Sequence, residues 1–568
     1  MQFGKLSEHA AKIVCAIFCA DFVAMLLMNT GRLYVHWLPV LFFASVAMFG
    51  VWIFRSEIFP ETAASYLTTS ERRSIVLVVL WAALLIAGIR LPYLMEGHLH
   101  HLVGPVVYDD TWHFQEINSL VHSIRYPAQC SLIPDRYFSF YYAPWMMIAA
   151  IYLALPLHGF TIKAAFAIGC AIYQILLCLT LLYIGLARSR SRRQIFAAVY
   201  LVAFWSGVDS ISTLMYYLTR RTWWFSALQM PIHFPIFFGG LVWAPHHLSA
   251  AVALILAWHL WDIAGEKSRS LLLMCSLLIA YSFYSSVFVF LGALPLGIWV
   301  TVFTARKDYG KVLTIALVAV VWIWPLLWLY LGKSNDVRFL FPFITSIQEL
   351  FPYTATLAGR SMRGSHSGGS AALGGIALGF AVFLIYIFLN FLPVALLLAR
   401  FGKKLPRNER WIAGTAVLFL LSTYFIGFPE GDNYASRGYV VPILVLSWIC
   451  AGLLPAFRIS PWVVAGVFFG SFGLLHEATF TYKSALHVAR APLDPGHGQA
   501  ILALNQDRKT RTVSGDTVAE LSLRNPDQTY FVEKFVPGGR THPVVADRQL
   551  ECAGPHGIWG WQRNPEVP

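Results

Sequence analysis

Charged residues are scarce in this chain: they make up 12% of its 568 residues, against about 25% in a typical soluble domain. This scarcity excludes a soluble enzyme and a disordered chain. Cysteine motifs are missing as well, because the eight cysteines are scattered singly without a CxxC pair, so the sequence predicts no zinc site. No asparagine lies in an N-x-Ser/Thr sequon, which favours a bacterial membrane over the secretory route.

Apolar residues dominate instead. They make up 57% of the chain, and 42 Phe, 25 Tyr and 20 Trp contribute to a mean hydropathy of +0.61. Apolar runs of about 20 residues can span the ~30 Å hydrocarbon core of a bilayer. The sequence therefore predicts an all-α, multi-pass membrane protein. Its net charge of +13 suits membrane orientation and contact with anionic lipid, so we expect no nucleic-acid partner.

Fourteen apolar runs are candidates for membrane helices. The first follows two lysines and lacks a small-x-small cleavage site, so it is predicted to be an uncleaved helix. The runs lie near residues 13–29, 35–54, 74–92, 141–157, 162–186, 195–207, 246–264, 270–286, 287–304, 312–331, 374–399, 412–427, 439–457 and 461–475.

The run at 141–157 decides the orientation of everything after it. If it does not span, the cytoplasmic loops carry twenty Lys and Arg in 66 residues, against ten in 165 residues on the opposite side. This asymmetry is what the positive-inside rule requires. We therefore predict an interfacial helix on the outer face at 141–157, about thirteen spans, a cytoplasmic N-terminus and an external C-terminus.

The composition divides the chain into four regions. The last has ten basic and nine acidic residues in 91, which is a soluble density, and it contains a helix-like and a strand-like stretch. The regions are 1–73 with two extra N-terminal spans, 74–331 with a core and long outer loops, 332–477 with the C-terminal spans and a basic outer loop, and 478–568, predicted to be a small α/β domain outside the membrane.

An acidic pair, Asp109-Asp110, lies in the first long outer loop, shortly before His113. Adjacent carboxylates repel each other, so the pKa of one rises unless a cation or metal lies between them. In a partly desolvated pocket such a pair supplies a base. The structural alternative is a solvated turn in which Asp110 caps a helix that starts at Thr111.

Two more outer segments hold candidate binding residues. His246-His247 lie at the outer end of a span, where imidazoles can bind metal or phosphate, although paired histidines also serve as polar anchors at an interface. Asp209 lies in the preceding outer loop, and an ion pair with Arg220 or Arg221 is its structural alternative.

Arg437 lies in an outer loop of only eleven residues, 428–438, which is held against the membrane surface. An interfacial Arg needs an anionic partner, either Asp432 or a lipid phosphate that the guanidinium holds bidentately. We favour the phosphate. The Gly/Ser-rich basic stretch at 360–369 is either a mobile lid over an anionic substrate or a flexible connection.

These features resemble the GT-C superfamily of integral-membrane glycosyltransferases over roughly residues 74–330. The chain departs from the family at two points: Asp110 lies where many members carry Glu, and the single Pro144 lies where sugar-lipid transferases often have two prolines. The segments that carry the resemblance are Asp109-Asp110, the phrase Tyr141-Tyr142-Ala-Pro144-Trp145 and the basic run Arg188 to Arg193.

The resemblance implies transfer of a sugar from a polyprenyl-phosphate donor to a lipid or glycan acceptor, on the outer face of the bacterial cytoplasmic membrane. A carboxylate would deprotonate the acceptor while cations offset the charge on the leaving phosphate. The implied roles are Asp109 as base, Asp110 and His113 as orienting residues or ligands of a divalent metal ion, Arg437, His246 and His247 at the phosphate, and Tyr142 and Asp209 in substrate binding.

Two other functions remain as alternatives. A transporter or flippase requires charges at mid-membrane depth, for which the sequence offers Asp21 and, near an inner end, Asp262. A lipid-linked polysaccharide polymerase or ligase shares the substrate chemistry but depends on the basic outer loop rather than on the acidic pair.

Overall fold

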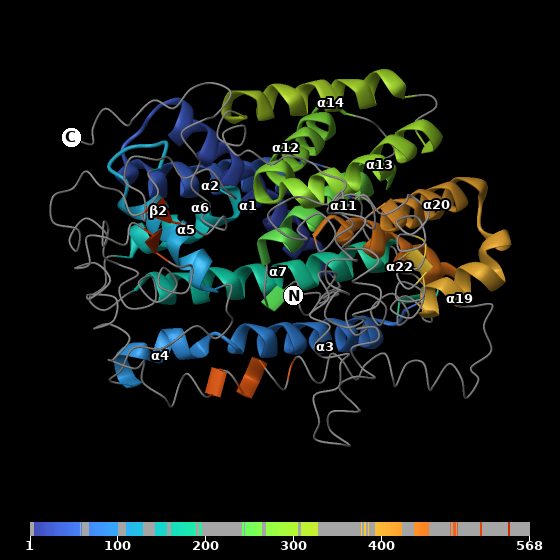
Figure 1. Ribbon diagram of the computed structural model, residues 1–568, viewed down its shortest axis with the longest axis horizontal. Helices are drawn as coiled ribbons and strands as arrows, with labels where there is room; N and C mark the ends of the chain where they lie inside the picture. Colours follow the sequence, from blue (N-terminus) through green and yellow to red (C-terminus); the bar gives the residue numbers. More distant parts are fainter. Residues whose placement is uncertain are drawn as a thin grey trace, which may run out of the picture.

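A computed structural model gives the fold of the protein (Figure 1). It describes residues 5–56, 67–99, 110–128, 142–155, 161–188, 245–263, 268–304, 308–327, 392–422 and 437–453, with a few short pieces besides. The α-helices are α1 (Leu6–Thr30), α2 (Leu38–Arg55), α3 (Thr69–Gly88), α4 (Leu91–Leu99), α5 (Asp110–His122), α6 (Tyr142–Ala154), α7 (Ile162–Arg188), α11 (Pro245–Ile263), α12 (Arg269–Ser285), α13 (Val287–Thr304), α14 (Tyr309–Ile323), α19 (Leu392–Phe401), α20 (Arg407–Ser422) and α22 (Val440–Leu453).

Short polar sequences fix several helix ends. Thr68 caps α3 in a capping box: its hydroxyl accepts from the backbone N–H of Glu71, whose carboxylate accepts from the backbone N–H of Thr68. Ser268 caps α12 by accepting from the N–H of Leu271. Three-residue 3₁₀ turns adjoin other helices: η2 (Val35–Trp37), η3 (Trp324–Leu326) and η4 (Gly402–Lys404).

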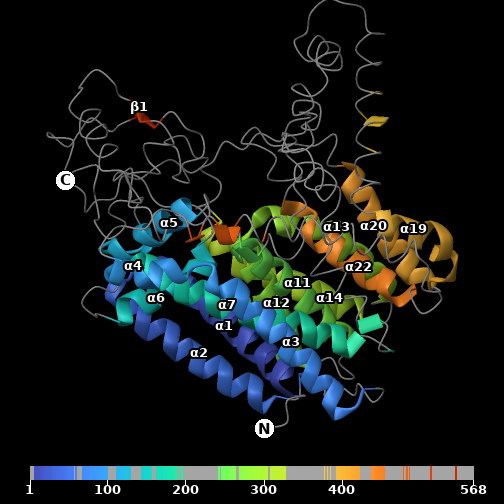
Figure 2. The ribbon, with the colours of Figure 1, turned by 90° about the horizontal axis from the view of Figure 1, so that it is seen from below.

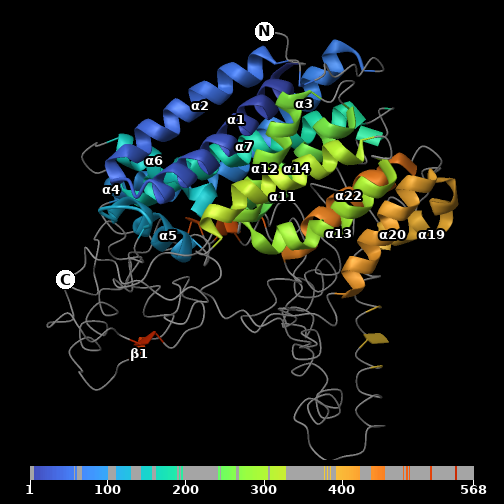
Figure 3. The ribbon, with the colours of Figure 1, turned by 90° about the horizontal axis from the view of Figure 1, so that it is seen from above.

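The helices form one bundle. α1, α2, α3 and α7 run side by side along one edge, α19, α20 and α22 form the opposite edge, and α11 to α14 lie between them (Figures 2 and 3). α1 is largely enclosed, since it packs against α2, α6, α7 and α12. Small residues along α1, among them Ala16, Ala20 and Ala24, are buried and let neighbouring backbones approach closely.

The bundle is that of a helical membrane protein, as predicted. Among the described residues, four helical stretches are long and apolar enough to cross a bilayer: Leu6–Thr30, Val35–Arg55, Ile162–Arg188 and Tyr309–Leu326. The last of these buries only 17% of its most apolar window inside the protein, so most of its side chains are available to lipid. The total of thirteen spans stays a prediction, because several of the apolar runs lie outside the described residues.

α6 covers most of the stretch at 141–157 that is predicted to be an interfacial helix, and its place at the membrane surface stays a prediction. Residues 142–150 are all buried, and the helix packs against α1, α2, α7 and α12. Gly169 on α7 makes room for it, because a Cβ there would come within 2.3 Å of Ile148 Cγ1. The helix is apolar on all sides, which agrees with its burial against the other helices.

The C-terminal region contributes two described strands, β1 (Thr512–Val513) and β2 (Val544–Val545), which pair in parallel. The helix-like and strand-like stretches predicted at 516–523 and 529–536 lie outside the described residues. The α/β domain therefore stays a prediction.

Candidate functional site

A buried ion pair fixes the start of α5. Arg90, in the turn between α3 and α4, places Nη2 2.6 Å from Oδ1 of Asp110, the first residue of α5. The hydroxyl of Tyr93 donates to the other oxygen, Oδ2, at 2.7 Å, and Arg90 also donates to the carbonyl of Val242. The two charged side chains are 1% and 0% exposed.

This geometry gives Asp110 a structural partner that the sequence did not reveal. One carboxylate oxygen accepts from a guanidinium and the other from a phenol, and the face of Phe166 lies 5.0 Å from Arg90 Cζ. A carboxylate held in this way clamps α5 to the end of α3. Its charge is offset by Arg90, so Asp110 is poorly placed to act as a base.

One turn further along α5, His113 forms a second buried pair. Its Nδ1 lies 2.9 Å from Oε2 of Glu116, three residues later on the same helix. The ring packs against Trp145 of α6, with centroids 4.7 Å apart, and against Phe166 of α7 at 5.8 Å. It also meets His246 in a T-shaped contact at 5.0 Å. Helix α5 is thereby joined to the first turn of α11.

That first turn carries the predicted histidine pair. The rings of His246 and His247 lie 3.9 Å apart, and both residues are buried. His247 Nδ1 is 2.8 Å from the hydroxyl of Ser286, between α12 and α13, while His246 packs against Trp145 at 5.3 Å. Both imidazoles are therefore held from several helices.

Arg437, just before α22, completes the cluster. Its guanidinium interacts electrostatically with both His246 and His247. Within the described part of the chain, Arg437 Nε is buried without a hydrogen-bond partner, and Asp432, the alternative partner, lies outside that part. A close contact positions this segment: a Cβ on Gly292 of α13 would come within 2.0 Å of the carbonyl oxygen of Gly438.

The structure thus brings together four residues that the sequence put forward separately: His113, His246, His247 and Arg437. We name them, with Glu116 and Trp145, the histidine–arginine cluster. Tyr142 is buried at the start of α6 and packs near Tyr126 instead, while Asp109 and Asp209 lie outside the described residues. Glu116 was missed, although its spacing of three residues from His113 on a predicted helix was an available signal.

The cluster suits an anion better than a metal ion. The imidazoles of His246 and His247 and the guanidinium of Arg437 supply donors, and the Glu116 carboxylate is already engaged by His113. The predicted metal ligands do not fit: both oxygens of Asp110 accept from Arg90 and Tyr93, and among the described residues no three His, Cys, Asp or Glu side chains group suitably.

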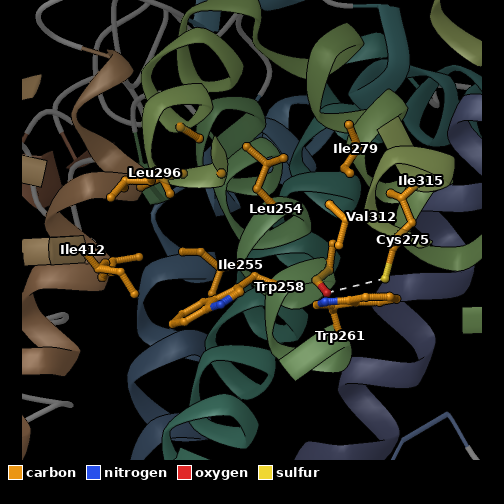
Figure 4. A pocket seen from close by; sticks show the side chains of 15 residues that line it. Leu254, Ile255, Trp258, Trp261, Cys275, Ile279, Leu296, Val312, Ile315 and Ile412 are labelled. Carbon is orange, nitrogen blue, oxygen red and sulfur yellow. Dashed lines mark hydrogen bonds between the residues drawn. The ribbon is translucent and has the colours of Figure 1, made fainter. Parts of the chain in front are cut away.

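An apolar cavity of about 180 Å³ lies further along α11 (Figure 4). Leu254, Ile255 and Trp258 of α11 face residues of α12, α13, α14, α20 and α22 across it, and none of the described side chains that line it is charged. Cys275 lines the cavity and donates its thiol to the carbonyl of Ala257. The apolar lining of this cavity suits a hydrocarbon chain.

Comparisons of the chain with protein families, with curated proteins and with solved structures find no match.

Proposed function

We propose that this protein is a membrane glycosyltransferase that transfers a sugar from a polyprenyl-phosphate donor to a lipid or glycan acceptor. The observation that carries the proposal is the group of three buried imidazoles at the first turn of α11: His113 meets His246, and Arg437 interacts electrostatically with His246 and His247. A guanidinium whose buried Nε has no hydrogen-bond partner among the described residues is suited to hold a phosphate.

This arrangement supplies what the reaction needs at the leaving group. When the bond from the sugar to the phosphate breaks, negative charge develops on the phosphate oxygen, and preorganised donors stabilise it. Imidazoles held by neighbours, such as His247 by Ser286, need little reorganisation at that moment. Sugar transfer from a lipid phosphate therefore makes use of the whole cluster.

The cavity along α11 supports a lipid donor. The histidines begin this helix, while Leu254, Ile255 and Trp258 of the cavity lie further along it. A donor with its phosphate at the first turn and its prenyl chain beside the same helix would contact polar groups only at one end. That is the polarity of a polyprenyl phosphate in a bilayer.

The proposed setting is the outer face of a bacterial cytoplasmic membrane. The excess of Lys and Arg in alternate loops supports thirteen spans, a cytoplasmic N-terminus and a periplasmic C-terminal domain. In this orientation the first turn of α11 and the start of α22 both lie at the outer end of the bundle, so the donor phosphate would be bound there.

The test is binding and turnover by the full chain in lipid nanodiscs. Undecaprenyl phosphate is the binding probe, and polyprenyl-phosphate monosaccharides with a membrane lipid extract as acceptor report transfer. Arg437→Ala should weaken probe binding about 10- to 100-fold, because a hydrogen bond to a charged group contributes about 1.5–3 kcal/mol. Arg269→Ala, an exposed arginine at the start of α12, is the matched control. Unchanged affinity in Arg437→Ala would refute the phosphate site.

A transporter is the second candidate, because Asp21 lies within α1 at full burial. Its carboxylate accepts from the Tyr173 hydroxyl of α7 and, at 2.8 Å, from the backbone N–H of Met147 on α6. Buried carboxylates inside membrane helices often mark transport pathways. Proteoliposomes decide the matter: movement of a fluorescent polyprenyl phosphate across the bilayer, lost in Asp21→Asn, would favour this function. The polymerase or ligase alternative depends on a loop outside the described residues.

A further inference from the structure

The buried pair formed by His113 and Glu116 has a geometry associated with proton transfer. Their 2.9 Å contact joins the carboxylate to Nδ1 of the ring. When Nδ1–H donates to the carboxylate, the neutral imidazole carries its lone pair on Nε2, which is the nitrogen that can accept a proton. Carboxylates orient catalytic histidines in this way in unrelated enzymes.

The pair is held rigidly. Asp110, one turn before His113, is fixed by Arg90 and Tyr93 at 2.6 Å and 2.7 Å, so the helix that carries the pair cannot rotate freely. Trp145 lies 4.7 Å from the imidazole. The side chains of His113 and Glu116 are 5% and 3% exposed, which keeps water from competing for their contact.

The pair also lies at the proposed phosphate site. The ring of His113 meets that of His246 at 5.0 Å, and His246 in turn interacts with Arg437. A donor phosphate on Arg437 and His246 would therefore place the sugar close to His113. The Asp110 carboxylate, in contrast, is committed to Arg90.

We propose that His113 is the general base of the transfer reaction and that Glu116 is its positioning residue; this inference rests on the proposed glycosyltransferase function. The acceptor hydroxyl gives its proton to Nε2 of His113 as its oxygen forms the bond to the sugar carbon. The bond between that carbon and the phosphate oxygen breaks, and its electron pair leaves with the polyprenyl phosphate, beside Arg437. Glu116 stabilises the imidazolium until its proton returns to solvent.

The experiment measures transfer and undecaprenyl phosphate binding in parallel. His113→Gln should lower the transfer rate by about 10²-fold or more with probe binding retained, because the base is lost and Arg437 is not. His122→Gln, on the same helix but outside the cluster, should transfer at the wild-type rate. Asp109→Asn provides the comparison with the base implied by the resemblance.

Glu116 is tested by a readout that a purely structural role would not change. Glu116→Gln should move the acid limb of the pH–rate profile to lower pH, because the imidazolium loses the carboxylate that favours its charged form. Glu116→Asp, which keeps the charge, should restore the profile in part.

Each outcome of these experiments supports or refutes the assignment of His113 as the base. Wild-type turnover in His113→Gln, or an unmoved pH profile in Glu116→Gln, overturns the assignment while leaving the glycosyltransferase proposal intact. Loss of turnover confined to Asp109→Asn assigns the base to that residue instead. If the wild-type protein binds the probe but transfers no sugar from any donor, the proposed function fails, and the assignment of His113 fails with it.

Discussion

Asp110→Asn tests the clamp at the start of α5, because the two interpretations of Asp110 give opposite results. The substitution keeps the shape of the side chain but leaves Arg90 buried, 1% exposed, without the counter-charge that Asp110 supplies. Removing one partner of a buried ion pair costs about 3–5 kcal/mol. The free energy of unfolding should therefore fall by about that amount.

The chain offers a matched exposed pair as control. Arg188 Nη2 lies 3.0 Å from Asp262 Oδ2, but these side chains are 23% and 37% exposed. Because solvent screens such a pair, Asp262→Asn should cost about 1 kcal/mol or less. A double variant, Arg90→Met with Asp110→Leu, should recover most of the lost stability, since no unpaired charge remains buried.

The assay is reversible unfolding of the full chain in mixed detergent micelles, followed by tryptophan fluorescence, with and without Mg²⁺ or Mn²⁺. The clamp predicts a large loss of stability in Asp110→Asn that neither cation restores. Two results would refute this reasoning: wild-type stability in Asp110→Asn, or recovery of sugar transfer on addition of a divalent cation, which would make Asp110 a metal ligand.

Three more predictions concern the Arg437 segment, His122 and the topology. Gly292→Ala should weaken undecaprenyl phosphate binding, because its methyl group displaces Gly438 and with it Arg437. Gly185→Ala is the control and should bind normally, because its Cβ meets nothing within 4 Å. Equal affinities of the two variants for the probe would contradict this prediction. Burial lowers the pKa of His122 to about 4. Between pH 6.5 and 4 the unfolded chain therefore binds a proton that the folded chain does not, so the free energy of unfolding should fall as the pH drops through this window. In melting experiments at several pH values, His122→Gln should reduce this loss of stability at low pH. The same pH dependence in the variant and the wild type would contradict the prediction. A membrane-impermeant maleimide should label Cys552 in intact spheroplasts after reduction; protection until the membrane is breached would reverse the proposed topology.

The sequence by itself determined the class of the protein and several local structures. Long apolar runs indicate membrane helices, because a backbone in hydrocarbon must satisfy its own hydrogen bonds and charged side chains are costly there. Helix ends are equally local: the helix predicted from residue 111 begins at Asp110, and the span predicted from 246 begins at Pro245. The candidate binding residues His246, His247 and Arg437 were also found from residue type and position alone.

Only the tertiary structure decided how these residues are used. Asp110 is bound by Arg90, twenty positions earlier, and His113 meets His246 from a distant helix. α6 is buried against α1, α2, α7 and α12, and its sequence alone did not identify these partners. Which helices touch depends on side-chain packing, such as the Gly292–Gly438 contact, and not on a residue's immediate neighbours in the chain. For that reason only the packed bundle shows which residue neutralises Asp110. The same holds for the grouping of the imidazoles near Arg437.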